Sequence, residues 1–305
     1  MPTAPVAALQ QKAAAESPHA VRGIAVMVIG VGLFSIMDSL VKYLGGIYHP
    51  LEVVFFRGWV AFVPIVAVIM ARGGFATIRT RKPGSHALRC VIGLGSTLLF
   101  FIALAGMPLA DAIAISFAGP LFVTALSQPL LGEAVGRHRW GAVIVGFLGV
   151  ILILRPGTNV IEPMAAVALA ATVCYALSTI AIRRLSVSES DSAMVFYYNS
   201  AVTLAATITL PFVWSPPSAW DLALLSCVGL LGGISGFFVT RAYRLAPAAL
   251  VAPFEYTAML WALVIGQLAF DETPGLGVLT GSAVVVASGL YILYRETRYR
   301  RAAKA

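Results

Sequence analysis

Long apolar stretches separated by short polar turns make up most of the chain. Ten stretches can be placed, at about residues 22–44, 52–71, 87–106, 109–131, 140–154, 163–182, 193–213, 221–243, 247–270 and 276–294. A transmembrane helix needs about 20 mostly apolar residues to cross the hydrocarbon core of a bilayer. Because the turns between the stretches are short, neighbouring helices should run antiparallel. The pattern predicts an all-α membrane protein with ten transmembrane helices.

The composition supports a membrane protein over a soluble one. Hydrophobic residues make up 59% of the chain and charged residues only 11%, whereas soluble domains carry about 25% charged residues. A soluble fold of this length could not bury so much apolar side chain.

The basic residues mark alternate turns of the chain. Of the 21 Lys and Arg residues, 18 fall on one side of the predicted membrane, Arg155 falls on the other, and Lys42 and Arg57 lie within apolar stretches. By the positive-inside rule, both termini are then cytoplasmic and the chain lies in the cell (inner) membrane. The net charge of +8 is therefore read as a topology signal that also contacts anionic lipids, not as a nucleic-acid surface.

The two halves of the chain resemble each other with an offset near 140 residues. Val54-Phe55-Phe56 matches Val195-Phe196-Tyr197, Lys42 matches Arg183, and Glu133 matches Glu272. We expect a disordered tail at residues 1–21, five-helix repeats at 22–154 and 163–294, and a basic tail at 295–305. Each repeat has an odd number of helices, so the two would be inverted relative to each other, as in many secondary transporters.

Several segments resemble the EamA type of the drug/metabolite transporter superfamily. They are Pro108-Leu109-Ala110-Asp111-Ala112, Leu131-Gly132-Glu133 and the stretch from Gly141 to Leu154, echoed by Pro247, Asp271-Glu272 and Gly281 to Leu290. The segments from Phe34 to Lys42 and from Val54 to Arg57 are similar to the branch that includes S-adenosylmethionine and riboflavin uptake proteins. The resemblance implies a ten-helix carrier built from two five-helix repeats.

Asp38, Lys42 and Arg57 lie inside the first two apolar stretches, where a charge costs at least about 2.5 to 3.5 kcal/mol. Asp38 and Arg57 lie at similar depths, about 9 Å below the outer helix ends at 1.5 Å per residue. Lys42 follows Asp38 by one turn, so it could pair with Asp38 or reach the outer interface. The three residues could form a structural cluster that locks the first two helices, or an outer gate or polar site for substrate.

Glu255 is an acidic residue predicted near mid-bilayer, about 12 Å into the ninth helix. Its counterpart in the first half is Ser116 of the fourth helix, and this helix enters the membrane from the side opposite to the ninth helix. Glu255 could bind substrate or carry a proton, or it could be a buried carboxyl group satisfied by Tyr or Ser. Tyr175 and Tyr198 could line a cavity for a planar substrate, or serve only in packing.

The sequence thus predicts a secondary transporter of a small organic metabolite, such as a vitamin or a nucleoside-like or amino-acid-like compound. It would act by alternating access as a monomer or homodimer, with no cofactor, because no phosphate-binding loop or metal-type spacing is found. A channel is an alternative, although it would need a continuous polar pore. An intramembrane serine protease is another, suggested by Gly233-Ile234-Ser235-Gly236, but no histidine is predicted at mid-membrane.

The asymmetry of the basic residues gives a testable prediction about topology. A reporter that is active only in the cytoplasm, fused after Ala305, should be active because both termini are predicted to be cytoplasmic. Activity of a reporter that works only outside the cytoplasm would reverse the topology and remove the basis for the inverted repeats.

Overall fold

The computed structural model describes residues 18–71, 73–132, 137–154, 163–185, 188–245 and 252–302. Within these ranges the chain forms helices and connecting turns and no strand. The α-helices are α2 (Pro18–Gly45), α3 (Pro50–Ala71), α4 (Pro83–Gly106), α5 (Leu109–Ser116), α6 (Gly119–Leu131), α7 (Arg137–Leu154), α8 (Pro163–Leu185), α9 (Asp191–Thr209), α10 (Ala219–Leu245), α12 (Thr257–Phe270) and α13 (Leu276–Ala302). Three short 3-10 helices are η1 (Gly74–Ile78), η2 (Leu210–Phe212) and η3 (Ala252–Tyr256).

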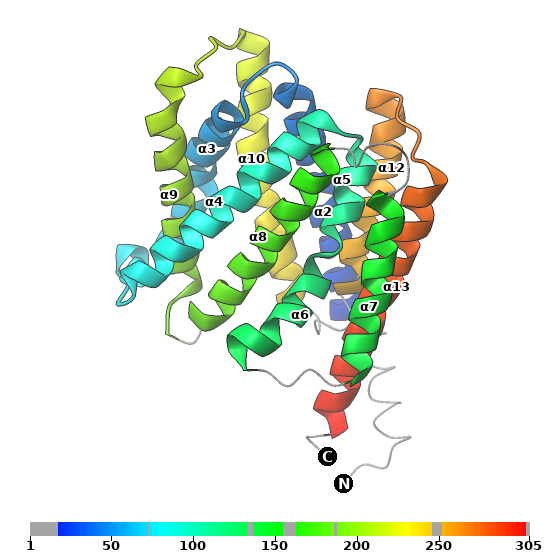
Figure 1. Cartoon of the computed structure of the whole chain (residues 1–305). Helices are drawn as coiled ribbons and strands as arrows, with labels where there is room; N and C mark the ends of the chain where they lie inside the picture. The colour runs from blue at the N-terminus through cyan, green and yellow to red at the C-terminus, as the bar shows by residue number, and fades with distance from the viewer. Residues whose placement is uncertain are drawn as a thin grey trace.

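The apolar stretches found in the sequence are helical in the structure. Seven helical segments are long and apolar enough to cross a membrane, and three shorter apolar segments, Trp140–Leu154, Phe254–Phe270 and Leu276–Ile292, account for the rest. The helices run alternately up and down the bundle, and the start of α2 and the end of α13 lie at the same end of it (Figure 1). The prediction of an all-helical integral membrane protein is therefore confirmed.

The outer faces of the helices are apolar. Only 28% of the residues in the apolar membrane-spanning part of α3 are buried inside the protein. On other helices as well as α3, large apolar side chains are at least 60% exposed, among them Val63, Val91, Leu204 and Leu268. Large apolar patches of this kind are unfavourable in water and favourable against lipid. Trp214, in the turn before α10, and Trp220, at the start of α10, are also exposed, as expected of aromatic residues at a membrane interface.

Two predicted helices are not continuous. The stretch predicted at 109–131 is divided into α5 and α6 by a turn at residues 117–118. In the stretch predicted at 247–270, the 3-10 helix η3 precedes α12, and residues 246–251 lie outside the described residues. The apolar pattern alone did not locate these breaks, because Leu109–Leu131 and Phe254–Phe270 are each apolar throughout.

The ends of the chain also differ from the prediction. The first helix begins at Pro18, four residues before the predicted start, and α13 continues to Ala302, through most of the segment predicted as a basic tail. Residues 1–17, which hold most of the predicted disordered tail, lie outside the described residues, as do Glu133, Arg155 and Pro247.

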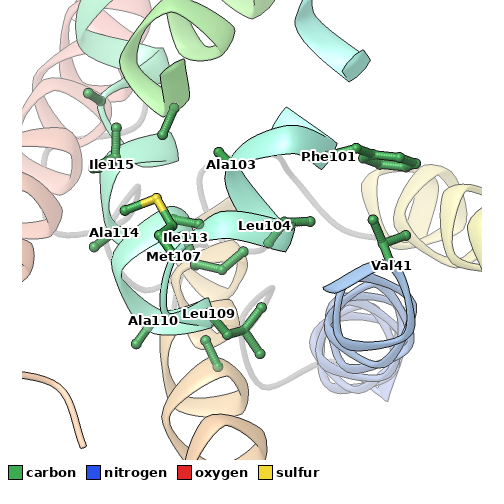
Figure 2. Packing of buried hydrophobic residues seen from close by; sticks show 14 of the residues in the cluster. Val41, Phe101, Ala103, Leu104, Met107, Leu109, Ala110, Ile113, Ala114 and Ile115 are labelled. Carbon is green, nitrogen blue, oxygen red and sulfur yellow. The ribbon is translucent and has the colours of Figure 1, made fainter. Parts of the chain in front are cut away.

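Helices from the two halves of the chain pack against one another. The most extensive pairs are α2 with α10, α7 with α13 and α4 with α8. The short helix α5 lies in the core of the bundle, where Leu109, Ala110, Ile113 and Ile115 are at most 5% exposed. Figure 2 shows these residues packed beside Leu104 and Met107, close to Val41 of α2.

Glycine permits the closest of these contacts, between α7 and α13. A Cβ atom on Gly149 would lie 2.8 Å from the carbonyl oxygen of Gly281, and a Cβ on Gly281 would lie 2.6 Å from the carbonyl oxygen of Gly149. The two backbones therefore touch directly, as small residues allow in membrane helix pairs. Gly141, on the same helix as Gly149, has no neighbouring atom within 4 Å of its Cβ position.

This contact predicts that two glycines of one helix respond differently to the same substitution. Gly149→Ala should force α7 and α13 apart and lower stability by about 1–3 kcal/mol, the usual cost of overpacking. Gly141→Ala should leave stability unchanged or raise it, because alanine is the better helix former. Thermal unfolding in detergent would compare them, and equal melting temperatures for the two variants would contradict the packing.

Candidate functional site

The two interrupted helices meet at their breaks. Phe117, in the turn between α5 and α6, contacts Tyr256, the last residue of η3, with ring centroids 5.1 Å apart and planes at 81°. Ser116 and Glu255 immediately precede these aromatic residues. The structure therefore brings together the two segments that carry the predicted pair Ser116 and Glu255.

Tyr175 of α8 joins this crossing. Its ring lies beside Gly119, at the start of α6, where a Cβ atom would approach the ring to 3.2 Å. The Glu255 carboxylate acts electrostatically on both Tyr175 and Tyr256. Both Glu255 and Tyr175 are accessible, and the Tyr175 side chain is 55% exposed. A carboxylate and the rings of tyrosine and phenylalanine thus come together at one place.

Asp38 of α2 and Arg57 of α3 also interact. Asp38 is 9% exposed, and its strongest charged neighbour is Arg57. The guanidinium group of Arg57 lies 5.8 Å from the centroid of the Phe101 ring and close to Gly232 of α10. The buried Nε atom of Arg57 has no hydrogen-bond partner among the described residues. The two charges are therefore coupled through space without forming a closed ion pair.

Lys42 does not pair with Asp38 or extend to the interface, as the helical spacing suggested. Its ammonium group forms an ion pair with Glu272, with 2.8 Å between Nζ and Oε1, and donates a hydrogen bond to the carbonyl oxygen of Met107. It also lies 5.3 Å from the centroid of the Phe270 ring. The predicted three-residue cluster is therefore wrong for Lys42, because a carboxylate from the other half of the chain lies closer than Asp38.

Glu272 also caps α5. Its second oxygen, Oε2, accepts a hydrogen bond of 2.8 Å from the backbone amide of Leu109, the first residue of α5. The first amides of a helix have no partner within the helix, and a negative charge at this end is favourable. We call Lys42, Glu272, the Met107 carbonyl and the Leu109 amide the outer link.

A second polar cluster lies at the opposite end of the bundle. Glu189, in the turn before α9, accepts a hydrogen bond of 3.3 Å from the backbone amide of Arg81 and lies 3.3 Å from Nε2 of His86. A hydrogen bond from the Thr80 hydroxyl, followed by these two contacts, lowers the pKa of Glu189 below its ordinary value. The cluster joins the turn before α4 to the turn before α9.

Tyr198 is not part of the central crossing. Its hydroxyl lies 2.7 Å from that of Thr97 and donates to the carbonyl oxygen of Gly93 at 3.2 Å, and the Arg89 guanidinium lies 4.9 Å from its ring centroid. These contacts hold Tyr198 between α9 and α4. Of the predicted site residues, the structure thus groups Ser116, Tyr175 and Glu255, pairs Asp38 with Arg57, and places Lys42 and Tyr198 elsewhere.

The sequence marked Glu272 only as the counterpart of Glu133 and as part of a segment shared with the EamA type. The cap is observed, but the ion pair to Lys42 was not expected. The sequence did contain one hint of this pair. Lys42 matches Arg183 and Glu272 matches Glu133, so both residues lie at positions that carry the same charge in each half of the chain.

Comparison with known proteins identifies the first half of the chain. Residues 21–155 match the EamA-like transporter family. This segment is an EamA domain. It contains α2 to α7, and with them Asp38, Arg57, Lys42 and Ser116.

Relatives of known name cover nearly the whole chain. An S-adenosylmethionine uptake transporter of Rickettsia prowazekii is 29% identical over 90% of this chain and 94% of its own. The pseudopaline exporter CntI of Pseudomonas aeruginosa is 29% identical over 87% of this chain and 94% of its own. A riboflavin transporter of Rhizobium johnstonii is 27% identical over 96% of this chain and 97% of its own.

The fold also has a match among solved structures. One crystal structure superposes with a TM-score of 0.62 at 17% identity, covering 92% of this chain and 98% of the other. At this identity the match concerns the fold alone.

The unclosed pair of Asp38 and Arg57 predicts a strong energetic coupling. Asp38→Asn or Arg57→Gln alone leaves one charge in a site of low polarity, whereas the double variant removes both. The loss in free energy of unfolding should therefore be smaller in the double variant than the sum of the losses in the two single variants, by about 1 kcal/mol or more. Thermal unfolding of the four proteins in detergent measures this coupling.

A second cycle provides the control for this pair. Asp271 lies in the turn after α12 and is exposed, so Asp271→Asn and Arg57→Gln should have additive effects. Additive losses for Asp38 and Arg57 as well would show that the two charges act independently.

Proposed function

We propose that the chain is a secondary transporter that moves a small organic metabolite across the cytoplasmic membrane by alternating access. Its binding site lies where the two interrupted helices cross. The observation that carries the proposal is the contact of Phe117 with Tyr256, which brings Ser116 and Glu255 to one region of the bundle. Tyr175 completes the site on the side of α8.

The interruptions themselves support a binding site. In hydrocarbon, every backbone amide and carbonyl needs a partner, so irregular backbone is tolerated only inside protein or beside a water-filled cavity. Transporters use such breaks because the exposed ends of half-helices bind polar groups of the substrate. Here α6 begins at Gly119 and α12 begins at Thr257, both directly after the crossing aromatic residues.

We further propose that the chain consists of two inverted five-helix repeats, at 22–154 and 163–294. The packing supports this relation, because α2 with α10 and α8 with α4 are matched pairs of helices, while α7 packs on its own counterpart α13. If the halves are equivalent, rocking one against the other can expose the central site to each side in turn.

A detail of the packing supports the same relation. A Cβ atom on Gly232 would meet Met37 and Arg57, while a Cβ on Gly93 would meet Ser178 and Tyr198. The sequence offset near 140 residues matches Met37 with Ser178 and Arg57 with Tyr198. Glycine thus occupies equivalent places in the two halves, and matched residues pack against it.

The substrate proposal extends only to chemical class. The named relatives take up S-adenosylmethionine, transport riboflavin or export pseudopaline. For this chain we propose a small organic metabolite with both polar and planar parts, because the crossing combines the Glu255 carboxylate with tyrosine and phenylalanine rings. We also propose cytoplasmic termini, on the basis of the basic residues.

The surroundings of Ser235, the serine that a protease would use as nucleophile, do not support the protease alternative. Ser235 is fully buried, and its hydroxyl donates a hydrogen bond to the backbone carbonyl of Leu231. A serine nucleophile instead needs a general base such as histidine within hydrogen-bond reach. His49 and His86 lie near helix starts, at the ends of the bundle.

The central test of the proposal is Glu255→Gln, which keeps the shape of the side chain and removes its charge. Transport should fall about tenfold or more, because one charged contact is worth about 1.4 kcal/mol or more. Glu255→Asp should retain part of the activity. Uptake into proteoliposomes, measured over a panel that includes S-adenosylmethionine and riboflavin, with and without a pH gradient, would provide the readout.

Asp271→Asn is the matched control, because it removes an exposed carboxylate outside the crossing. Its transport should equal that of the unaltered protein. If Glu255→Gln transports normally with unchanged pH dependence, Glu255 is structural, and the site must be sought around Asp38 and Arg57.

A further inference from the structure

We infer that Lys42 and Glu272 are positioning residues that hold α5, and with it Ser116 in the central site, when the outer end of the bundle is closed. The inference rests on the proposed function in two respects. It takes the crossing as the binding site, and it takes the end of the bundle opposite to the cytoplasmic termini as the outer end. It goes beyond that function by assigning a part in transport to two charged residues that lie outside the crossing.

The outer link joins three segments that are distant in sequence. Lys42 lies in the last turn of α2, Met107 and Leu109 flank the turn between α4 and α5, and Glu272 follows α12. The side chains of Lys42 and Glu272 are only 11% and 19% exposed. Solvent therefore screens their attraction weakly, and the pair fastens the end of α12 to the first half of the chain.

The helix held by this link is short and stiff. It has eight residues, which at 1.5 Å per residue corresponds to a length of about 12 Å. Its residues from Ala112 to Ile115 are at most 5% exposed, so it fits closely among its neighbours (Figure 2). A close-packed helix of this length moves as one body, so a shift at Leu109 must reach Ser116.

Both ends of α5 contact the second half of the chain. At the first end Glu272 accepts the hydrogen bond from Leu109, and just past the last residue Phe117 packs on Tyr256. The helix also packs along α12 between these points. It thus connects the outer link directly to the crossing that carries Ser116 and Glu255.

The charges of the link act as a unit. If the outer end opens by separating α12 from α2, then Lys42 and Glu272 lose each other and Leu109 loses its cap in the same step. Removing one partner of a partly buried pair leaves the other charge uncompensated, whereas removing both does not. The two residues should therefore be coupled, and their effect should appear at Ser116.

The experiment measures access to Ser116 from outside the cell. The cysteines Cys90, Cys174 and Cys227 are replaced by alanine, and Ser116→Cys is introduced as a reporter. A membrane-impermeant maleimide is added to intact cells, and the rate of labelling is compared among variants. Labelling after permeabilisation, together with a single peak in size-exclusion chromatography, shows that each variant is folded.

Glu272→Gln is the first variant, because glutamine can still accept the Leu109 hydrogen bond but cannot pair with Lys42. External labelling should rise about tenfold, and Lys42→Met should raise it at least as much. The double variant should label no faster than the faster single variant, because both changes break one interaction. Where a single variant fails to fold, comparison of the double variant with the unaltered reporter provides the same test.

Asp271→Asn is the control, because Asp271 precedes Glu272 but contacts Gln267 at the surface, and asparagine tolerates its left-handed backbone, with φ of 54°. It should label as slowly as the unaltered reporter. Unchanged labelling in folded Glu272→Gln, or single effects that multiply in the double variant, would overturn the inference. Labelling does not depend on transport, so a loss of the proposed role of Glu255 would be seen separately.

Discussion

The whole architecture depends on one constraint, which is that backbone groups in hydrocarbon must find partners inside the protein. Continuous helices meet it unaided, but the breaks after α5 and before α12 create helix ends in the interior. The same need arises at the start of α5, after the turn from α4, where the Leu109 amide donates to the Glu272 carboxylate from the other half of the chain, which is in turn held by Lys42. The short helix that ends at the candidate site thus begins at a charged contact that connects the halves.

Two pairs of charged residues in the membrane region differ in how their members are bound. The Lys42 and Glu272 pair is closed, with an ammonium group, a carboxylate and two backbone groups in mutual contact. Asp38 and Arg57 are coupled but open, and the buried Nε of Arg57 lacks a partner in the described part of the chain. The closed pair resists separation of the segments it joins, while the open pair leaves the buried Nε of Arg57 without a hydrogen bond in the described part of the chain.

The sequence predicted the helices well because the hydrophobic requirement of a bilayer applies to every residue of a crossing segment. It failed where a contact depends on the fold. Lys42 has Asp38 as a neighbour by helical spacing, yet its partner Glu272 is 230 residues away. The breaks near Phe117 and Tyr256 escaped for the same reason, since they interrupt the backbone without interrupting the hydrophobic pattern. The internal similarity of the halves did match the two segments that meet at Phe117 and Tyr256, which carry Ser116 and Glu255.

The glycine contacts of Arg57 and Tyr198 bear on how such a chain could arise. Two identical halves, assembled from separate copies, would carry the same residue at both places. Two arginines would bring a second charge into the membrane next to Thr97 and Gly93, where Tyr198 now donates and accepts hydrogen bonds. Two tyrosines would leave Asp38 without the cation that now faces it. If the two halves descend from one sequence, an arginine at one place and a tyrosine at the other mean that the two copies no longer shared a single coding sequence when these residues diverged.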